Sequence, residues 1–317
     1  MITREEIIES LAFLSDATQK IIVVYGLSDD LTILKLNIHR DHLDALCDIM
    51  IKSIKEKMVK KEYQVRSYRS ADERQSYYEY DMSDETKEIR LLRETPGNDN
   101  IPIFRFNKNT ISEINSLIFV ITNGNKTITL YKDISGVEKI YTQRSYIIKK
   151  SKEQFVRETE DMLRISASFH MIRVNGTTVL TNLDILENRN GFKNIIINEA
   201  LRDAQKVEDK QIISNYDEFK CALKGDISLS KKLINAMAKS PVLSISNERI
   251  IEFSKTNRRL QGKLDYTSKN NQFYLKNKKQ IQWFLKLLND DFLRSLLSEE
   301  EYESGNKDII QENRNQD

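Results

Sequence analysis

Apolar residues recur with two different periods along the chain, and the change of period predicts both helices and strands. Thr3 and Glu6 form a capping-box pattern ahead of apolar residues spaced for one helical face, so we expect the chain to open with a helix. Residues 21–25 and 31–38 are short apolar runs separated by a polar turn. This arrangement favours a β-hairpin.

An amphipathic helix is expected after the first hairpin. Asp41 is a residue type that caps helices, and the apolar positions that follow it up to Met58 repeat every three or four residues. Cys47 belongs to this apolar face and is therefore expected in the core. Residues 96–100, Pro-Gly-Asn-Asp-Asn, predict a linker or long turn.

Two Asn-Gly pairs, at residues 123–124 and 175–176, each lie between apolar runs. Asn-Gly tolerates the positive φ that a type I′ turn requires at both central positions, so both pairs predict two-residue hairpins. Residues 103–106 are a further short apolar run, and residues 149–163 are interpreted as a helix. The runs that flank the two pairs are residues 117–122, 127–131, 168–174 and 177–180.

From about residue 183 onward the pattern changes to short helices. The expected helices are residues 192–207, 216–223, 228–238, 247–253 and 278–297. We therefore predict an α+β fold, with an antiparallel, hairpin-built sheet and helices followed by a mainly helical C-terminal part. The expected domains are an N-terminal α+β domain at 1–96, a second domain at 101–305 (sheet 101–182, helical part 183–300) and a polar tail at 306–317.

The composition is that of a globular protein, with 39% hydrophobic and 31% charged residues. Cys47 and Cys221 are too few and too far apart for a disulfide framework, which favours a reducing compartment. The opening residues lack the pattern of a signal peptide, and the apolar runs are much shorter than a membrane helix. We expect a soluble, cytoplasmic protein.

Common catalytic and cofactor motifs are missing from the sequence. There is no GxSxG elbow, no GxGxxG and no GxxxxGK[ST], so hydrolase, dinucleotide and Walker-type sites are unsupported. His39 and His42 lack an identifiable third ligand and are interpreted as a solvated pair, while His170 in its strand is interpreted as a hydrogen-bonded structural residue. Cys221 is interpreted as a packing residue. No catalytic residue, metal ligand or cofactor is therefore predicted.

A metal-dependent nuclease is the enzymatic alternative. Glu208 and Lys210 have the ExK spacing of such enzymes, and Asp184 lies upstream, so the three could gather around a scissile phosphate. The residues before Glu208 favour a helix, whereas such a site is normally projected from a strand. Asp290 and Asp291 are a second acidic pair, which we interpret as helix-start carboxylates before Phe292.

The strongest functional signal is a basic segment, residues 249–286. It contains ten Lys and Arg against two acidic residues, a net charge of +8, whereas residues 287–317 contain nine acidic residues against three basic ones, a net charge of −6. Aromatic residues are interleaved with the cations, a mixture typical of sequence-tolerant binding to phosphate backbones with occasional base stacking. The predicted DNA-binding residues are Arg258, Arg259, Lys263, Lys269, Lys276, Lys278 and Lys279.

Residues 162–307 resemble the KwaB family, the soluble components of the Kiwa anti-phage defence system. The resemblance depends on the hairpin at 168–180 (SFHMIRVNGTTVL), on Leu-Glu-Asn-Arg-Asn-Gly-Phe at 186–192, on the helix pair up to Pro241, and on residues 286–302. It is a match of order and spacing, and a looser similarity extends back to about residue 101.

The resemblance implies a bacterial cytoplasmic protein that binds DNA and works with the membrane protein KwaA to obstruct replication or expression of phage DNA. It also implies a homodimer that does not insert into the membrane itself but is recruited to its inner face by its partner. It transfers no catalytic residues. We therefore expect a non-enzymatic, backbone-dominated DNA binder. The alternatives are the metal-dependent nuclease and a protein-interaction module whose basic segment faces the acidic tail, or an acidic partner, instead of nucleic acid.

Overall fold

The computed structural model describes residues 1–70, 76–143, 146–189, 191–239, 241–269, 271–294 and 301–303. The chain divides into two compact units. Unit 1 consists of Met1–Arg66, Gln75–Tyr80 and Glu85–Asn190, and unit 2 consists of Ser67–Arg74, Asp81–Asp84 and Gly191–Asp317. Most of the acidic segment 287–317, including the expected polar tail at 306–317, lies outside the described residues.

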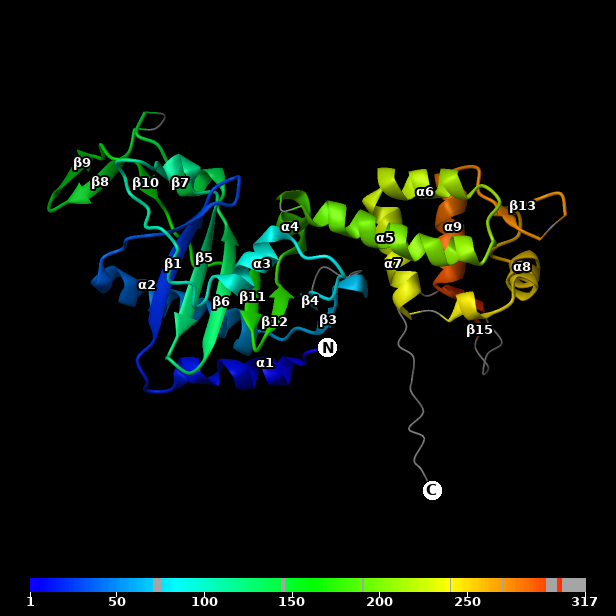
Figure 1. Cartoon of the computed structure of the whole chain (residues 1–317), viewed down its shortest axis with the longest axis horizontal. Helices are drawn as coiled ribbons and strands as arrows, with labels where there is room; N and C mark the ends of the chain where they lie inside the picture. Colours follow the sequence, from blue (N-terminus) through cyan, green and yellow to red (C-terminus); the bar gives the residue numbers. More distant parts are fainter. Residues whose placement is uncertain are drawn as a thin grey trace, which may run out of the picture. The chain divides into compact units, whose positions relative to one another are not determined.

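An eight-stranded sheet with the order β2-β1-β5-β6-β11-β12-β4-β3 organises unit 1 (Figure 1). The pairs β2–β1, β1–β5, β5–β6, β6–β11, β11–β12 and β12–β4 are all antiparallel, as the hairpin-built prediction requires. The strands are β1 (Ile21–Leu27), β2 (Ile33–Lys35), β3 (Val65–Ser67), β4 (Tyr77–Glu79), β5 (Ser116–Thr122), β6 (Thr127–Asp133), β11 (Met171–Val174) and β12 (Thr177–Leu180).

Unit 1 also contains four α-helices among its described residues. They are α1 (Arg4–Leu11), α2 (Arg40–Ile54), α3 (Lys87–Glu94) and α4 (Leu183–Arg189). Ile7 of α1 and Met50 of α2 share one buried apolar cluster with Phe119 of β5 and Leu130 of β6, while α3 packs against β6. In the described residues of both units, short helical turns lie at Ala12–Ser15, Lys55–Lys60, Tyr68–Ser70, Ile111–Glu113, Gly136–Glu138 and Val242–Ser244.

The helix starts follow the predicted chemistry in one case and depart from it in the other. Thr3 and Glu6 form the expected capping box of α1. The prediction that Asp41 caps α2 was wrong, because the N-cap is His39 and Asp41 lies in the first turn, where the helix dipole also favours a carboxylate. Cys47 is buried on α2, as predicted.

The two Asn-Gly pairs form different turns. At 175–176 the strands pair up to Val174 and Thr177, and both turn residues have positive φ, so the predicted type I′ hairpin is confirmed. At 123–124 the pairing ends at Thr122 and Thr127, which leaves a four-residue loop. Because Asn123 does not adopt positive φ and only Gly124 does, a two-residue turn at this position was a wrong prediction.

The helix expected at 149–163 is absent, since these described residues form strands. They contain β8 (Ile148–Ser151), β9 (Gln154–Arg157) and β10 (Met162–Leu163). β8 and β9 pair across the turn at Lys152 and Glu153, and Lys152 has a φ of 55°, which breaks a helix. β10 pairs with β7 (Lys139–Ile140). The run at 103–106 makes a single bridge, between Ile103 and Lys35.

Unit 2 is mainly helical, as predicted for the C-terminal part. Its helices are α5 (Phe192–Asp209), α6 (Tyr216–Gly225), α7 (Ile227–Lys239), α8 (Asn247–Thr256) and α9 (Lys278–Leu288). The helix expected at 278–297 is shorter than predicted, because Asn289 ends it and Asp290 adopts a φ of 56°. The short strands are β13 (Asp265–Tyr266), β14 (Phe273–Tyr274), β15 (Phe292–Arg294) and β16 (Glu301–Glu303).

The expected domain boundary does not separate the two units. The expected boundary at 96–101 falls inside unit 1, where β1 pairs with β5, so strands from both sides of it belong to one sheet.

Among the residues that the structure describes, no helix combines the length and apolar character needed to cross a membrane.

Candidate nucleic-acid interface

The basic segment forms one continuous stretch of unit 2, from α8 through the β13–β14 hairpin to α9 (Figure 1). Several of its apolar side chains are buried: the Phe273 and Phe284 rings lie 5.4 Å apart, and Phe284 packs edge-to-face on Phe219 of α6. Leu260 and Leu264 are also buried. Because these residues occupy the interior, the intervening cations are left on the surface.

All seven predicted DNA-binding side chains are exposed, but two of them already have an acidic partner. The Lys276 ammonium lies 2.9 Å from Asp265, and Lys278 forms an ion pair with Asp226. Within the described part of the chain, the remaining five make no ion pair. These five, Arg258, Arg259, Lys263, Lys269 and Lys279, carry the uncompensated charge of the segment.

The contacts of the two acidic partners, Asp265 and Asp226, lower the pKa values of their carboxyl groups. Hydrogen bonds from Gln280 and Lys276 lower the pKa of Asp265, and the hydrogen bond from Lys278 lowers the pKa of Asp226. Both carboxylates therefore stay ionised over the physiological pH range, so Lys276 and Lys278 offer less free charge to a ligand than the other five.

The start of α9 concentrates positive charge. Asn277 caps the helix by accepting a hydrogen bond from the backbone N–H of Gln280 at 3.0 Å. Lys278 and Lys279 follow in the first turn, which contains no acidic residue. The helix dipole is positive at this end, so two lysines are electrostatically unfavourable there, whereas an anion is favoured. This arrangement suits binding of an external phosphate better than it suits the stability of the helix.

Aromatic rings accompany four cations of the segment. The Lys263 and Lys286 ammonium groups lie 5.9 and 4.7 Å from the centre of the Trp283 ring. Lys255 lies 4.9 Å from the Tyr266 ring centre and Lys276 lies 5.9 Å from that of Tyr274. Cations and aromatic faces are thus placed together, as in proteins that combine phosphate contacts with base stacking.

Sequence reasoning did not select Lys255 and Lys286 as site residues, although both belong to the basic segment. Lys286 lies three residues after Trp283 on α9, and side chains at that spacing share a helical face. The helical period could therefore have identified Lys286. Lys255 meets Tyr266 across the loop between α8 and β13, a contact that only the tertiary structure reveals.

A hollow of about 540 Å³ lies beside the start of α9. Tyr274, Lys276 and Lys278 line it together with Asp226 and Ile281. The lining thus combines one aromatic ring, apolar residues and two lysines whose ammonium groups are already paired with Asp265 and Asp226. The five uncompensated cations of the basic segment lie outside this hollow.

The residues of the nuclease alternative are divided between the two units. Glu208 lies at the end of α5 and Lys210 is its C-cap, so both project from a helix as expected. Asp184 lies on α4 in unit 1, whereas the other two lie in unit 2. Within the described ranges, no group of three or more His, Cys, Asp or Glu side chains could hold a metal ion.

Three other predictions concern single residues. His170 is buried and its Nδ1 accepts a hydrogen bond from the Asp133 backbone N–H at 3.0 Å, which confirms its structural interpretation. Cys221 is exposed, so its interpretation as a packing residue was wrong. The prediction that Asp290 and Asp291 begin a helix was also wrong, because they follow the end of α9.

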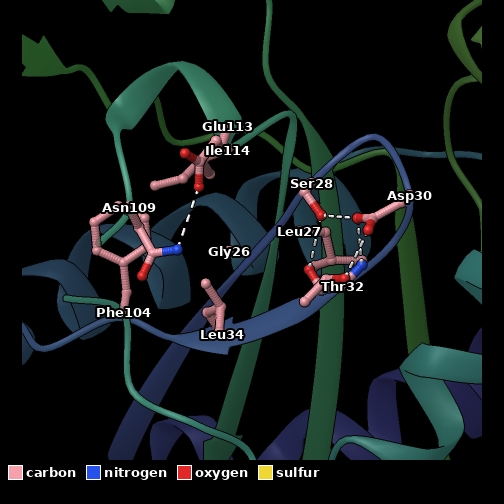
Figure 2. Close-up of a pocket in the computed structure, with 10 residues that line it drawn as sticks. All are labelled: Gly26, Leu27, Ser28, Asp30, Thr32, Leu34, Phe104, Asn109, Glu113 and Ile114. Atoms are coloured by element: carbon pink, nitrogen blue, oxygen red, sulfur yellow. Dashed lines mark hydrogen bonds between the residues drawn. The ribbon is translucent and has the colours of Figure 1, made fainter. Parts of the chain in front are cut away.

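A second hollow, of about 280 Å³, lies in unit 1 beside the β1–β2 turn. The two carboxylates that line it, Asp30 and Glu113, accept hydrogen bonds from residues close by in the sequence. Figure 2 shows Asp30 accepting hydrogen bonds from Ser28 and Thr32, and Glu113 accepting one from Asn109 at 3.3 Å. Asp30 therefore stabilises the turn, and Glu113 stabilises the short helix Ile111–Glu113 in which it lies. The geometry gives neither carboxylate a catalytic arrangement.

The basic segment lies inside the part of the chain that matches a known protein family. Residues 111–298 match the family described as Kiwa protein KwaB-like. The chain is also 23% identical over 207 residues to the Kiwa protein KwaB of Escherichia coli O55:H7 (strain RM12579 / EPEC). That alignment covers 64% of this chain and 65% of the relative, which is slightly less than two thirds of the relative's length. No solved structure matches the chain.

Proposed function

The chain belongs to the KwaB-like family of Kiwa proteins, and from this premise we propose that it acts in Kiwa anti-phage defence by binding DNA through its basic segment. The observation that carries the proposal is the exposed, uncompensated charge of Arg258, Arg259, Lys263, Lys269 and Lys279. A surface that keeps such charge without acidic partners is suited to a polyanion.

The binding is dominated by the phosphate backbone. The arginines and lysines contact phosphates, and each neutralised phosphate releases counterions, so affinity falls steeply with salt. Trp283 and Tyr274 add stacking on sugars or bases, which tolerates any sequence because every base has an aromatic face. The protein therefore binds unrelated DNA sequences with similar affinity.

The biological consequence that we propose is obstruction of phage DNA replication or expression. The protein acts as a homodimer with the membrane protein KwaA, which recruits it to the inner face of the cell membrane. DNA held along a basic surface is inaccessible to polymerases, so no bond needs to be cleaved. This role requires neither a cofactor nor a metal ion.

A charge-neutralising triple variant tests the proposal. Arg258→Gln, Arg259→Gln and Lys279→Gln remove three of the uncompensated cations, and all three side chains are exposed, so the fold should be retained. A matched control, Lys52→Gln, Lys108→Gln and Lys126→Gln, removes three exposed cations of unit 1. We expect the first variant to retard several unrelated DNA duplexes less than the control does, by a similar factor for each.

Three results would contradict the proposal. Equal retardation by the two triple variants would reject the basic segment as the binding site. Cleavage of plasmid DNA by the pure protein with Mg²⁺ or Mn²⁺ would favour the nuclease. The absence of retardation at physiological salt would favour the protein-interaction module.

A further inference from the structure

A two-stranded hairpin, β8–β9, projects from one end of unit 1 (Figure 1). Residues 148–151 are all exposed, and in residues 154–157 only Val156 is partly buried. An isolated two-stranded hairpin is at best marginally stable in water, because neither face is covered. This hairpin nevertheless exposes large apolar side chains: Phe155 is 73% exposed and Ile148 is 56% exposed.

The pairing register assigns these side chains to one face. Residues directly opposite each other in an antiparallel pair lie on the same face, and alternate positions along a strand also share a face. Ile148 pairs with Arg157 and Lys150 pairs with Phe155, so these four residues form one face of the hairpin. Tyr146 joins them, since the Arg157 guanidinium lies 4.9 Å from its ring centre.

The opposite face has a different charge balance. Lys149 and Val156 pair with each other there, and the Lys149 ammonium lies 2.7 Å from a Glu158 carboxylate oxygen. The cation of this face is therefore neutralised. The face with Phe155 contains two cations, Lys150 and Arg157, and no acidic residue among its described members.

We infer that the Lys150–Phe155 face of this hairpin is a second nucleic-acid contact of the chain, which enters a groove of duplex DNA. The inference rests on the proposed function. A two-stranded β-ribbon is one of the two elements that the major groove admits. Lys150 and Arg157 would meet the phosphates at the edges of the groove, and Phe155 would pack against base edges or sugars.

The chemistry of the face favours a nucleic acid over a lipid surface. Its apolar part consists of only three side chains, Tyr146, Ile148 and Phe155, and two cations lie among them. Membrane binding scales with buried apolar area, so such a small patch is a weak anchor. Aromatic rings interleaved with cations are instead the combination that phosphates and bases require.

Two matched double variants of the full chain test the inference. Lys150→Gln with Phe155→Ser alters one cross-strand pair of the proposed face, and Lys149→Gln with Val156→Ser alters the neighbouring pair of the other face. Each variant removes one positive charge and one apolar side chain. We expect the first to weaken binding of a fluorescent 30-base-pair duplex about tenfold in an anisotropy titration, since one apolar contact and one phosphate contact are lost. The second should bind as the unmodified protein does.

The outcomes separate this inference from the proposed function. Unchanged or equally weakened binding in the two double variants, with the triple variant of the basic segment still impaired, would refute the hairpin contact alone. Absence of duplex binding by the unmodified protein would refute both proposals. Binding of the unmodified protein to phosphatidylserine vesicles that the Lys150/Phe155 variant loses, with duplex affinity unchanged, would assign the face to lipid instead.

Discussion

Lys132 is a buried cation on the central strand β6, and replacing it tests how unit 1 tolerates charge in its interior. The residue is only 2% exposed, and its ammonium lies 2.9 Å from both a Glu138 carboxylate oxygen and the Ser168 hydroxyl. Ser166 donates a further hydrogen bond to Glu138 at 2.6 Å. Lys132→Met keeps an unbranched apolar side chain that is one atom shorter, but leaves Glu138 as a buried charge without its cation.

The cost follows from what Glu138 loses. Burial acts to raise the pKa of Glu138, but hydrogen bonds from Lys132, Ser166 and the Ser135 backbone outweigh it and lower the pKa to about 2. Removing one partner of a buried ion pair costs about 3–5 kcal/mol, because the other charge stays desolvated. We expect Lys132→Met to lower the free energy of unfolding of unit 1 by about 3 kcal/mol at pH 7.

The pH dependence gives the sign of the effect. In the unmodified protein the folded-state pKa of Glu138 is lowered, so its stabilisation is present above the ordinary value of 4.5 and is lost as the pH falls towards 2. In Lys132→Met, burial without the cation raises the pKa, so protonation at lower pH relieves the unpaired charge. The difference in stability between the two proteins should therefore be smaller at pH 4 than at pH 7.

The assay is urea unfolding followed by hydrogen exchange of β5 and β6 peptides, at pH 7 and pH 4. The double variant Lys132→Met with Glu138→Gln is the control, and it should recover part of the loss because no buried charge is left unpaired. A loss below about 1 kcal/mol at pH 7, or the same loss at both pH values, would refute this account of the pair.

Three further predictions concern other parts of the chain. Arg69→Met should destabilise unit 2 by about 3 kcal/mol, because the nearly buried carboxylates of Glu199 and Asp203 lose a shared partner. Urea unfolding followed by Trp283 fluorescence measures this loss, and no change would mean that Arg69 does not hold these two carboxylates. Gly176→Ala should lower the melting temperature by an amount equivalent to about 1 kcal/mol, since its φ is 80°, while Gly136→Ala, at ordinary φ and in open space, should not; equal effects would contradict the turn assignment. Lys279→Glu should stabilise the protein slightly, by about 0.5 kcal/mol, through the helix dipole of α9 and yet weaken DNA binding; a loss of stability would contradict the unfavourable placement of this lysine.

Local chemistry predicted the elements that depend on neighbouring residues. The Asn-Gly pair at 175–176 fits a two-residue turn because the strands close directly on it, whereas the pair at 123–124 does not, because pairing stops at Thr122 and Thr127. Lys, Glu and Gln in residues 149–163 have the composition of a helix. Cross-strand pairing of Ile148 and Lys149 with Arg157 and Val156 overrides that preference.

Long-range contacts were the part that the sequence could not supply. The pairing of β1 with β5 joins segments on either side of the expected boundary at 96–101, and no local pattern encodes which strands become neighbours. The same limit applies to the site: the density of cations in the basic segment is visible in the sequence, but their neutralisation is not. Asp226 reaches Lys278 from the start of α7, far away along the chain.

The salt dependence of DNA binding tests the central claim most directly. The dissociation constant of a 30-base-pair duplex is measured by anisotropy from 50 to 300 mM NaCl for the Arg258/Arg259/Lys279 variant and for the Lys52/Lys108/Lys126 control. Each lost phosphate contact should reduce the magnitude of the slope of log affinity against log salt by about 0.9. The slope of the Arg258/Arg259/Lys279 variant should therefore be smaller in magnitude than that of the control by about 2.7. Identical slopes would show that the basic segment does not contact the DNA backbone.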